Sequence, residues 1–199
     1  MSGAASAAQK ILVFGDSLSA AYGLAQSRGW VALLEERLKR EKLDYNVVNA
    51  SISGETTSGG RARIGKVLAQ HRPAVVIIEL GGNDGLRGLP VAQLRENLAA
   101  MIDASRGAGA RVLVVGMRMP PNSGPDYTHD FDRAFAEAAR RRGAALVPFI
   151  LQGIADREEL FQPDRIHPNE AAQPNLLDNV WAVLGPMLKR AKSDAFGKR

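Results

Sequence analysis

The stretch AVVIIEL at residues 74–80 determines the fold class of this 199-residue chain. Its side chains are apolar or β-branched at nearly every position, which indicates a strand buried on both faces at the centre of a parallel sheet. Further strands are predicted at residues 10–15, 45–49, 111–116 and 145–149. Pro148 in the last of them has no N–H group to donate, which favours a position at the edge of the sheet.

Amphipathic helices are predicted between these strands. Ser58 is expected to cap the second helix, and Gly107 and Gly143 are expected to end the third and fourth. The alternation of strands and helices predicts a three-layer α/β/α sandwich around a five-stranded parallel sheet. Apolar side chains recur at intervals of three or four positions over residues 30–38, 64–68, 94–102, 127–138 and 176–188.

The composition, with 45% hydrophobic and 24% charged residues, is typical of a globular domain. The length suits one domain, expected over residues 9–192, between a flexible leader at residues 1–8 and a flexible tail at residues 193–199. The leader has neither the charged start nor the apolar core of a signal peptide. The longest strongly apolar stretch is far shorter than the ~20 residues that span a bilayer, so no stable membrane insertion is expected.

The chain has a net charge of +5, and its basic residues are dispersed. The densest run, at residues 140–142, lies at the end of a predicted helix, where cations interact favourably with the helix dipole. A nucleic-acid-binding protein would gather basic and aromatic residues in a stripe. We therefore expect no nucleic-acid partner and interpret the charge as a solvated face, with a mild preference for anionic substrates or lipid surfaces.

Four loops follow predicted strands, and in a parallel α/β sheet ligands bind beyond the carboxyl ends of the strands. Taken alone, the first loop is explained by a helix cap, the third by a tight turn and the fourth by a loop hydrogen bond, and the second is uninformative. Their convergence at one edge of the sheet indicates a functional site. The loops are GDSLS at residues 15–19, NASISGET at 49–56, GGND at 81–84 and PDRIHPN at 163–169.

These loops contain the components of a serine hydrolase. A serine hydroxyl needs an adjacent base, so Ser17 is the candidate nucleophile and His167 the candidate base. Asp164 lies three residues before His167, a spacing that lets its carboxylate hold the imidazole tautomer. The Ser17 and Gly54 N–H groups and the Asn83 side-chain amide are candidate oxyanion donors. For Gly54 the missing Cβ allows close approach of the backbone.

Three other polar residues near these segments are interpreted as structural. Asp16 is expected to shape the turn that carries Ser17. His71 is expected at the end of a helix, and His129 on the surface or at the rim of the binding groove. No cysteine is present, which excludes disulfides, thiolate metal sites and a cysteine nucleophile. No metal and no other cofactor is expected.

The four loop motifs resemble the four sequence blocks of the SGNH/GDSL hydrolase family, and most of all its bacterial thioesterase I/protease I/lysophospholipase group. The resemblance implies a flavodoxin-like sheet in the order 2-1-3-4-5. It also implies metal-free hydrolysis of acyl esters, thioesters and lysophospholipids by Ser17, His167 and Asp164, with Gly54 and Asn83 in the oxyanion hole. A periplasmic or secreted location is implied as well.

Two other functions remain open at this point. Within the family, the chain could be a carbohydrate O-deacetylase or an arylesterase. Outside enzymes, it could be a non-catalytic flavodoxin-like binding module, although such a module has no need of a nucleophile and a base. The expected partner is a small acyl ester or thioester, and a monomer is expected because the sequence contains no apolar seam for a dimer.

Overall fold

The stretch at residues 74–80 forms the central strand of the sheet in a computed structural model that describes residues 8–196. This strand, β3 (Val75–Glu79), is buried at every position and pairs with β1 (Gln9–Gly15) and β4 (Arg111–Val115). The edges are β2 (Tyr45–Asn49) and β5 (Ala145–Val147), and all pairings are parallel. The order β2-β1-β3-β4-β5 confirms the predicted sheet, including the edge position of its last strand. β5 ends before Pro148, which cannot donate to a ladder.

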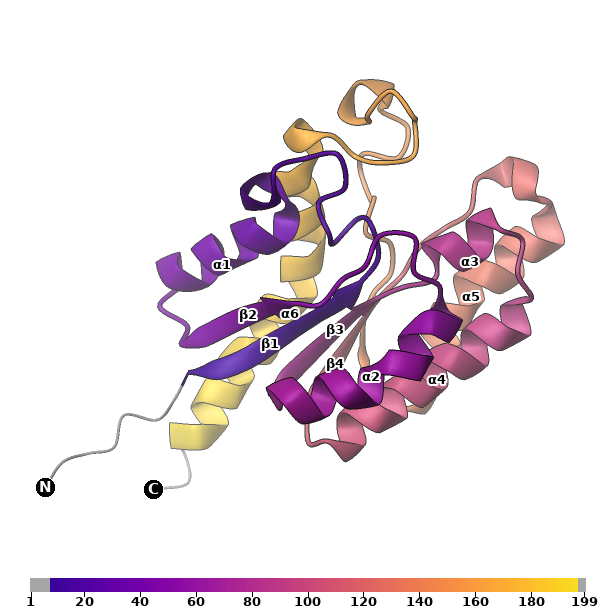
Figure 1. The fold of residues 1–199 in the computed structure, drawn as a ribbon. Helices are drawn as coiled ribbons and strands as arrows, with labels where there is room; N and C mark the ends of the chain where they lie inside the picture. The colour runs from indigo at the N-terminus through magenta and orange to yellow at the C-terminus, as the bar shows by residue number, and fades with distance from the viewer. Residues whose placement is uncertain (1–7, 197–199) are drawn as a thin grey trace, which may run out of the picture.

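Helices cover both faces of this sheet (Figure 1). α1 (Trp30–Arg40) and α6 (Gln173–Phe196) pack on one face, and α2 (Thr57–His71), α4 (Val91–Gly107) and α5 (Pro125–Arg141) pack on the other. Successive side chains of β1 enter opposite cores because side chains alternate across a strand. Ile11 and Val13 pack with α1 and α6, whereas Leu12 and Phe14 pack with the other three helices. The predicted sandwich is confirmed.

Three local predictions are corrected by the structure. Thr56 rather than Ser58 caps α2, because Thr56 has extended backbone and its hydroxyl accepts a hydrogen bond from the Gly59 N–H at 3.3 Å. The GGND stretch, which taken alone is typical of a tight turn, begins a short helix instead, α3 (Gly82–Leu86). α6 continues to Phe196, four residues into the expected tail, because no glycine or proline occurs between Pro186 and Phe196.

The expected leader at residues 1–8 lies outside the described residues except for Ala8, and so do residues 197–199 of the expected tail. Within residues 8–196, none of the helices has the length and apolar character needed to cross a bilayer. Short 3₁₀ helices occupy the loops: η1 (Gln26–Arg28), η2 (Pro121–Ser123), η3 (Glu158–Leu160) and η4 (Glu170–Ala172).

Candidate active site

Ser17 lies in a tight turn at the carboxyl end of β1. The Asp16 carboxylate accepts a hydrogen bond from the Leu18 N–H at 3.0 Å, and the Asp16 carbonyl accepts one from the Ala20 N–H at 2.9 Å. The first contact is an Asx turn, in which a side chain replaces a backbone acceptor and fixes the next two residues. Asp16 therefore shapes this turn as predicted, and the Ser17 side chain is left half-buried at the edge of the sheet.

The structure brings Ser17, His167 and Asp164 together in one hydrogen-bonded chain. His167 Nε2 lies 2.9 Å from Ser17 Oγ, and His167 Nδ1 lies 2.7 Å from Asp164 Oδ2. A carboxylate only accepts hydrogen bonds, so the imidazole proton belongs on Nδ1 and Nε2 is the acceptor for the serine hydroxyl. In such an arrangement an imidazole can take the proton of the hydroxyl.

Asp164 and His167 belong to a single tight turn after β5. Asp164 Oδ1 accepts hydrogen bonds from the Ile166 and His167 N–H groups, both at 3.0 Å, and the His167 carbonyl accepts one from the Gln162 N–H at 2.8 Å. The hydrogen bonds from the His167 backbone and side chain, followed by that from Ile166, lower the pKa of Asp164 to about 2. The turn is closed by Arg165 in the left-handed region, at φ +58°. Asp164 is thus ionised across the neutral range.

Tyr22 covers one face of the His167 ring, with the two ring centroids 4.4 Å apart. The chain returns to this position because the Tyr22 N–H donates to the Ser17 carbonyl at 3.1 Å. The Tyr22 carbonyl in turn accepts a hydrogen bond from the Gln162 side-chain amide at 2.8 Å. A ring contact and a hydrogen bond therefore join the loop after β1 to the turn after β5. The sequence motifs did not predict these contacts.

Asn83 lies against the turn that carries Ser17. Its side-chain Nδ2 donates to Asp16 Oδ2 at 3.1 Å and to the Glu55 carbonyl at 3.0 Å. Both N–H groups of the amide therefore have acceptors, and an oxyanion bound by Asn83 would have to share or replace one of them. Gly81 makes this placement possible, because its φ is +128° and a Cβ there would lie 2.8 Å from the Phe135 ring.

Gly54, the other candidate donor, lies in the loop after β2 with a φ of +79°. Its carbonyl accepts a hydrogen bond from Arg87 Nη2 at 2.9 Å, which ties this loop to the end of α3. A Cβ on Gly54 would meet only the Arg87 guanidinium, at 3.9 Å. Within the protein, the left-handed backbone rather than crowding accounts for glycine here.

Two buried acids beside the site were not predicted. Asp84 is 2% exposed and accepts hydrogen bonds from the Thr57 N–H and hydroxyl, which joins α3 to the start of α2. Glu79 is 3% exposed at the end of β3 and accepts a hydrogen bond from the Ser19 hydroxyl at 2.7 Å. A sequence signal exists for Glu79, because it is the one charged residue within the apolar stretch at residues 74–80.

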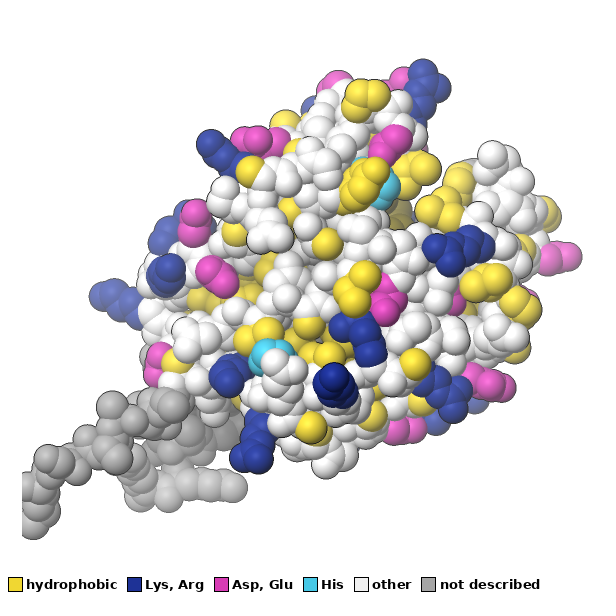
Figure 2. Space-filling model, in the orientation of Figure 1, with side chains coloured by type: hydrophobic (Ala, Val, Ile, Leu, Met, Phe, Trp, Pro, Cys, Tyr) yellow, Lys and Arg dark blue, Asp and Glu magenta, His cyan; other side chains and the backbone are white. Residues whose placement is uncertain are grey.

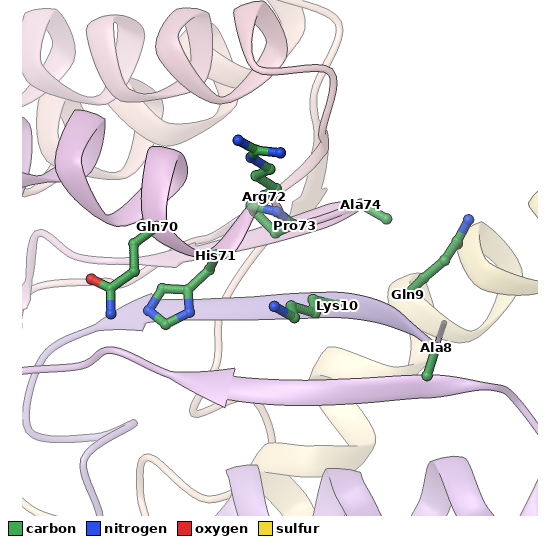
Figure 3. Close-up of a pocket in the computed structure, with 8 residues that line it drawn as sticks. All are labelled: Ala8, Gln9, Lys10, Gln70, His71, Arg72, Pro73 and Ala74. Carbon is green, nitrogen blue, oxygen red and sulfur yellow. The ribbon is translucent and has the colours of Figure 1, made fainter. Parts of the chain in front are cut away.

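The remaining histidines lie on helices, outside the hydrogen-bonded chain of Ser17, His167 and Asp164. His71 is the last residue of α2, as predicted, and His129 is exposed on α5. His71, Lys10 and Arg72 line a hollow of about 510 Å³ where β1 and β3 begin, at the opposite end of the strands (Figure 3). No serine or acidic residue lines it, so the hollow lacks the nucleophile and carboxylate of the first site. Across residues 8–196, no three His, Cys, Asp or Glu side chains gather as metal ligands.

The model of the GDSL-like lipase/acylhydrolase family matches residues 13–173, a segment that contains all four site loops. Esterase TesA of Pseudomonas aeruginosa is 55% identical over 182 residues, which cover 92% of this chain and 90% of that protein. An arylesterase of Vibrio mimicus is 41% identical over 180 residues, or 90% of each chain. Thioesterase 1/protease 1/lysophospholipase L1 of Escherichia coli is 38% identical over 184 residues, or 92% of this chain and 87% of that protein.

Solved structures show the same similarity. A crystal structure of TesA superposes with a TM-score of 0.88 at 54% identity, covering 89% of this chain and 99% of that one. The psychrotrophic esterase EstA from Pseudoalteromonas, inhibited by monoethylphosphonate, superposes with a TM-score of 0.87 at 41% identity. That match covers 91% of this chain and 99% of EstA. The sandwich and the loops at its carboxyl edge therefore recur in solved esterases.

Proposed function

The chain belongs to the GDSL-like lipase/acylhydrolase family and is a hydrolase of ester bonds, and we propose that it acts through an acyl-serine intermediate on Ser17. The resemblance inferred from the four sequence motifs is thereby confirmed. The observation that carries the proposal is the contact of 2.9 Å between Ser17 Oγ and His167 Nε2, with Asp164 on the other ring nitrogen. A nucleophile, a base and an orienting carboxylate are the groups that acyl transfer to water requires.

In the proposed mechanism, Ser17 Oγ attacks the acyl carbon while its proton passes to His167 Nε2. Hydrogen bonds stabilise the tetrahedral oxyanion. When this intermediate collapses, the bond to the leaving group breaks, and the leaving thiol or alcohol takes the proton from His167. Water then attacks the acyl-serine, again giving its proton to His167, and the second collapse returns that proton to Ser17 and releases the carboxylic acid. Asp164, ionised throughout, stabilises the imidazolium in both halves.

We propose the Ser17 and Gly54 N–H groups and the Asn83 amide as the oxyanion donors. Asn83→Ala is expected to lower kcat by roughly 100-fold or more, because each preorganised donor acts where charge develops in the transition state. KM for a short p-nitrophenyl ester should change little. The control is Asn46→Ala, since Asn46 is exposed on edge strand β2. A kcat equal to that of the control would remove Asn83 from the oxyanion hole.

An apolar rim surrounds this site and supports acyl esters and thioesters as substrates. Among residues 8–190, with residue 121 left out, the large hydrophobic side chains that are exposed are Tyr22, Ile52, Leu86 and Ile166, each between 48% and 56% exposed. Each belongs to a loop or short helix that carries a proposed catalytic or oxyanion group. Figure 2 shows hydrophobic side chains around a hollow on the upper part of the molecule, over the loops that follow the strands. Such a rim binds the hydrocarbon part of a substrate.

The substrate class is tested with p-nitrophenyl esters of increasing acyl length. We expect kcat/KM to rise by about fourfold for each CH₂ that the rim buries, from ~0.8 kcal/mol per CH₂. Leu86→Ser should flatten this dependence and leave the acetyl ester unaffected. Acyl-CoA and lysophospholipid should be hydrolysed faster than an acetylated sugar; the reverse order would indicate a carbohydrate O-deacetylase. Failure of a fluorophosphonate to label Ser17 would indicate the binding module instead.

We further propose that the enzyme acts as a monomer in the periplasm or outside the cell, in a single domain. The motif resemblance supports the location. The monomer is supported by the rim, because over residues 8–190, apart from residue 121, the exposed large apolar side chains belong to the loops and short helix of the site.

A further inference from the structure

Glu79 lies directly beneath the turn that carries Ser17. Its Oε2 accepts a hydrogen bond from the Ser19 hydroxyl at 2.7 Å and a longer one from the Asp16 N–H at 3.4 Å. The packing is close, since a Cβ on Gly15 would lie 2.7 Å from both Glu79 Oε2 and Ser19 Oγ. The end of β3 is therefore bonded to both sides of the nucleophile, at positions 16 and 19.

The contacts of Glu79 extend from Ser17 to the oxyanion site. The Asp16 N–H donates the longer bond to Glu79, and the Asp16 carboxylate accepts a hydrogen bond from the Asn83 side-chain amide. On the other side of Ser17, the Ser19 carbonyl accepts a hydrogen bond from the Asn49 side-chain amide at 2.8 Å, which also joins the turn to β2. A shift of the Glu79 carboxyl would thus move the turn of Ser17 and the acceptor that orients Asn83.

Burial of two neighbouring acids at this point is costly, which argues for a function. Asp16 and Glu79 are 2% and 3% exposed, and within the described chain neither forms an ion pair with a lysine or arginine. An apolar side chain at the end of a buried strand would avoid the desolvation penalty of a carboxyl group. Such a side chain could not accept the hydrogen bonds from Ser19 and Asp16.

We propose that Glu79 is a positioning residue for ester hydrolysis, holding the turn of Ser17 and, through Asp16, the Asn83 amide in the arrangement that the reaction requires. The inference rests on the proposed acyl-serine mechanism. It assigns Glu79 no contact with substrate; Glu79 acts through Ser19 and Asp16.

The protonation of this pair gives the proposal a measurable signature. Burial, and then the charge of Asp16, raise the pKa of Glu79 well above its usual range. Burial raises the pKa of Asp16 to about 6, with Asp84 raising it further and the Leu18, Asn83 and His167 contacts opposing the rise. Between these two titrations the pair holds one proton and one negative charge. Activity should therefore fall as the pH rises through the titration of Glu79, because a second negative charge then forms beside Asp16.

The test compares Glu79→Gln, Glu79→Leu and Ser19→Ala with Ser105→Ala. Ser105 is also fully buried, but its hydroxyl bonds the Met101 carbonyl within α4, so its variant controls for loss of a buried hydroxyl. Activity on p-nitrophenyl acetate is measured from pH 5 to 10, per active site titrated with a phosphonate, with Ser17→Ala as the background. Thermal unfolding is followed in parallel.

Glu79→Gln keeps an acceptor and cannot ionise, so it should retain kcat within about threefold at pH 7 and extend the plateau to higher pH. Glu79→Leu and Ser19→Ala should lower kcat by about 10–100-fold, because a displaced nucleophile loses its attack geometry, and should change KM little. An alkaline limb in Glu79→Gln equal to that of the parent enzyme would overturn the proposal. So would a kcat in Ser19→Ala equal to that of Ser105→Ala, with only thermal stability reduced.

A Glu79→Leu chain that does not fold leaves the decision to the other two variants. Failure of the proposed mechanism itself is visible separately, because Ser17→Ala would then hydrolyse the ester as fast as the parent enzyme.

Discussion

Replacing Ser17 by alanine is expected to lower ester hydrolysis by about 10⁵- to 10⁶-fold, the scale of nucleophile deletions in triad enzymes. The substitution removes the one oxygen that lies 2.9 Å from His167 Nε2, so the imidazole has no hydroxyl to deprotonate. The half-buried side chain is small, and its loss leaves the Asx turn made by Asp16 intact. Thermal unfolding should therefore change little while kcat for p-nitrophenyl acetate falls to background.

The matched control is Ser58→Ala, an exposed serine in the first turn of α2. It should keep full activity and full labelling by a fluorophosphonate, whereas the Ser17 variant should show neither. Substantial hydrolysis by Ser17→Ala would refute the acyl-serine mechanism.

Asp164→Asn is expected to lower kcat by about 10⁴-fold. The reason lies in how the two carboxylate oxygens are used. Oδ1 accepts the Ile166 and His167 N–H groups, which keeps the carbonyl of the asparagine on that side. Its NH₂ group then faces His167 Nδ1, where the structure has an acceptor at 2.7 Å. The imidazole must adopt the opposite tautomer, which places a proton on Nε2 and leaves no base for Ser17.

The control for this variant is Asp156→Asn, which neutralises an exposed acid earlier in the same loop. It should retain the activity of the parent enzyme. A loss of less than tenfold in Asp164→Asn would show that the carboxylate is not needed to set the tautomer. For both variants, kcat and KM are measured at pH 7. At this pH the lowered pKa of Asp164 keeps its carboxylate fully ionised in the parent enzyme.

The sequence predicted the fold because its signals are local and mutually consistent. The apolar stretch at residues 74–80 needs burial on both faces, which the centre of a parallel sheet provides. The alternation of strands and helices then places helices on both faces of that sheet. The same rule placed Ser17, Asn83 and His167 at one edge, since parallel strands end together. The prediction of the cap at Ser58 failed because it depended on which of two nearby polar residues, Thr56 or Ser58, has extended backbone.

The contacts that hold the site together were beyond local reasoning. Tyr22 against His167 and Glu79 against Ser19 join segments that are remote in the chain, and no periodicity indicates such pairs. A buried acid in an apolar strand is a visible signal, but its partner depends on strand register. Parallel pairing sets Glu79 beside Gly15, one residue before Asp16.

The turn that holds Asp164 and His167 has a consequence for how the enzyme acquires activity during folding. These two residues are three positions apart, whereas Ser17 and His167 are separated by 150 positions. The contact between Asp164 and His167 thus forms within one turn. The contact between His167 and Ser17 joins residues that are among the most distant in sequence of those in contact. Contacts of such high sequence separation carry the largest loop-closure cost. If Ser17 and His167 act together as proposed, activity depends on closure between the first strand and the last loop. A chain with a complete sheet but an undocked 161–168 segment is therefore expected to be inactive.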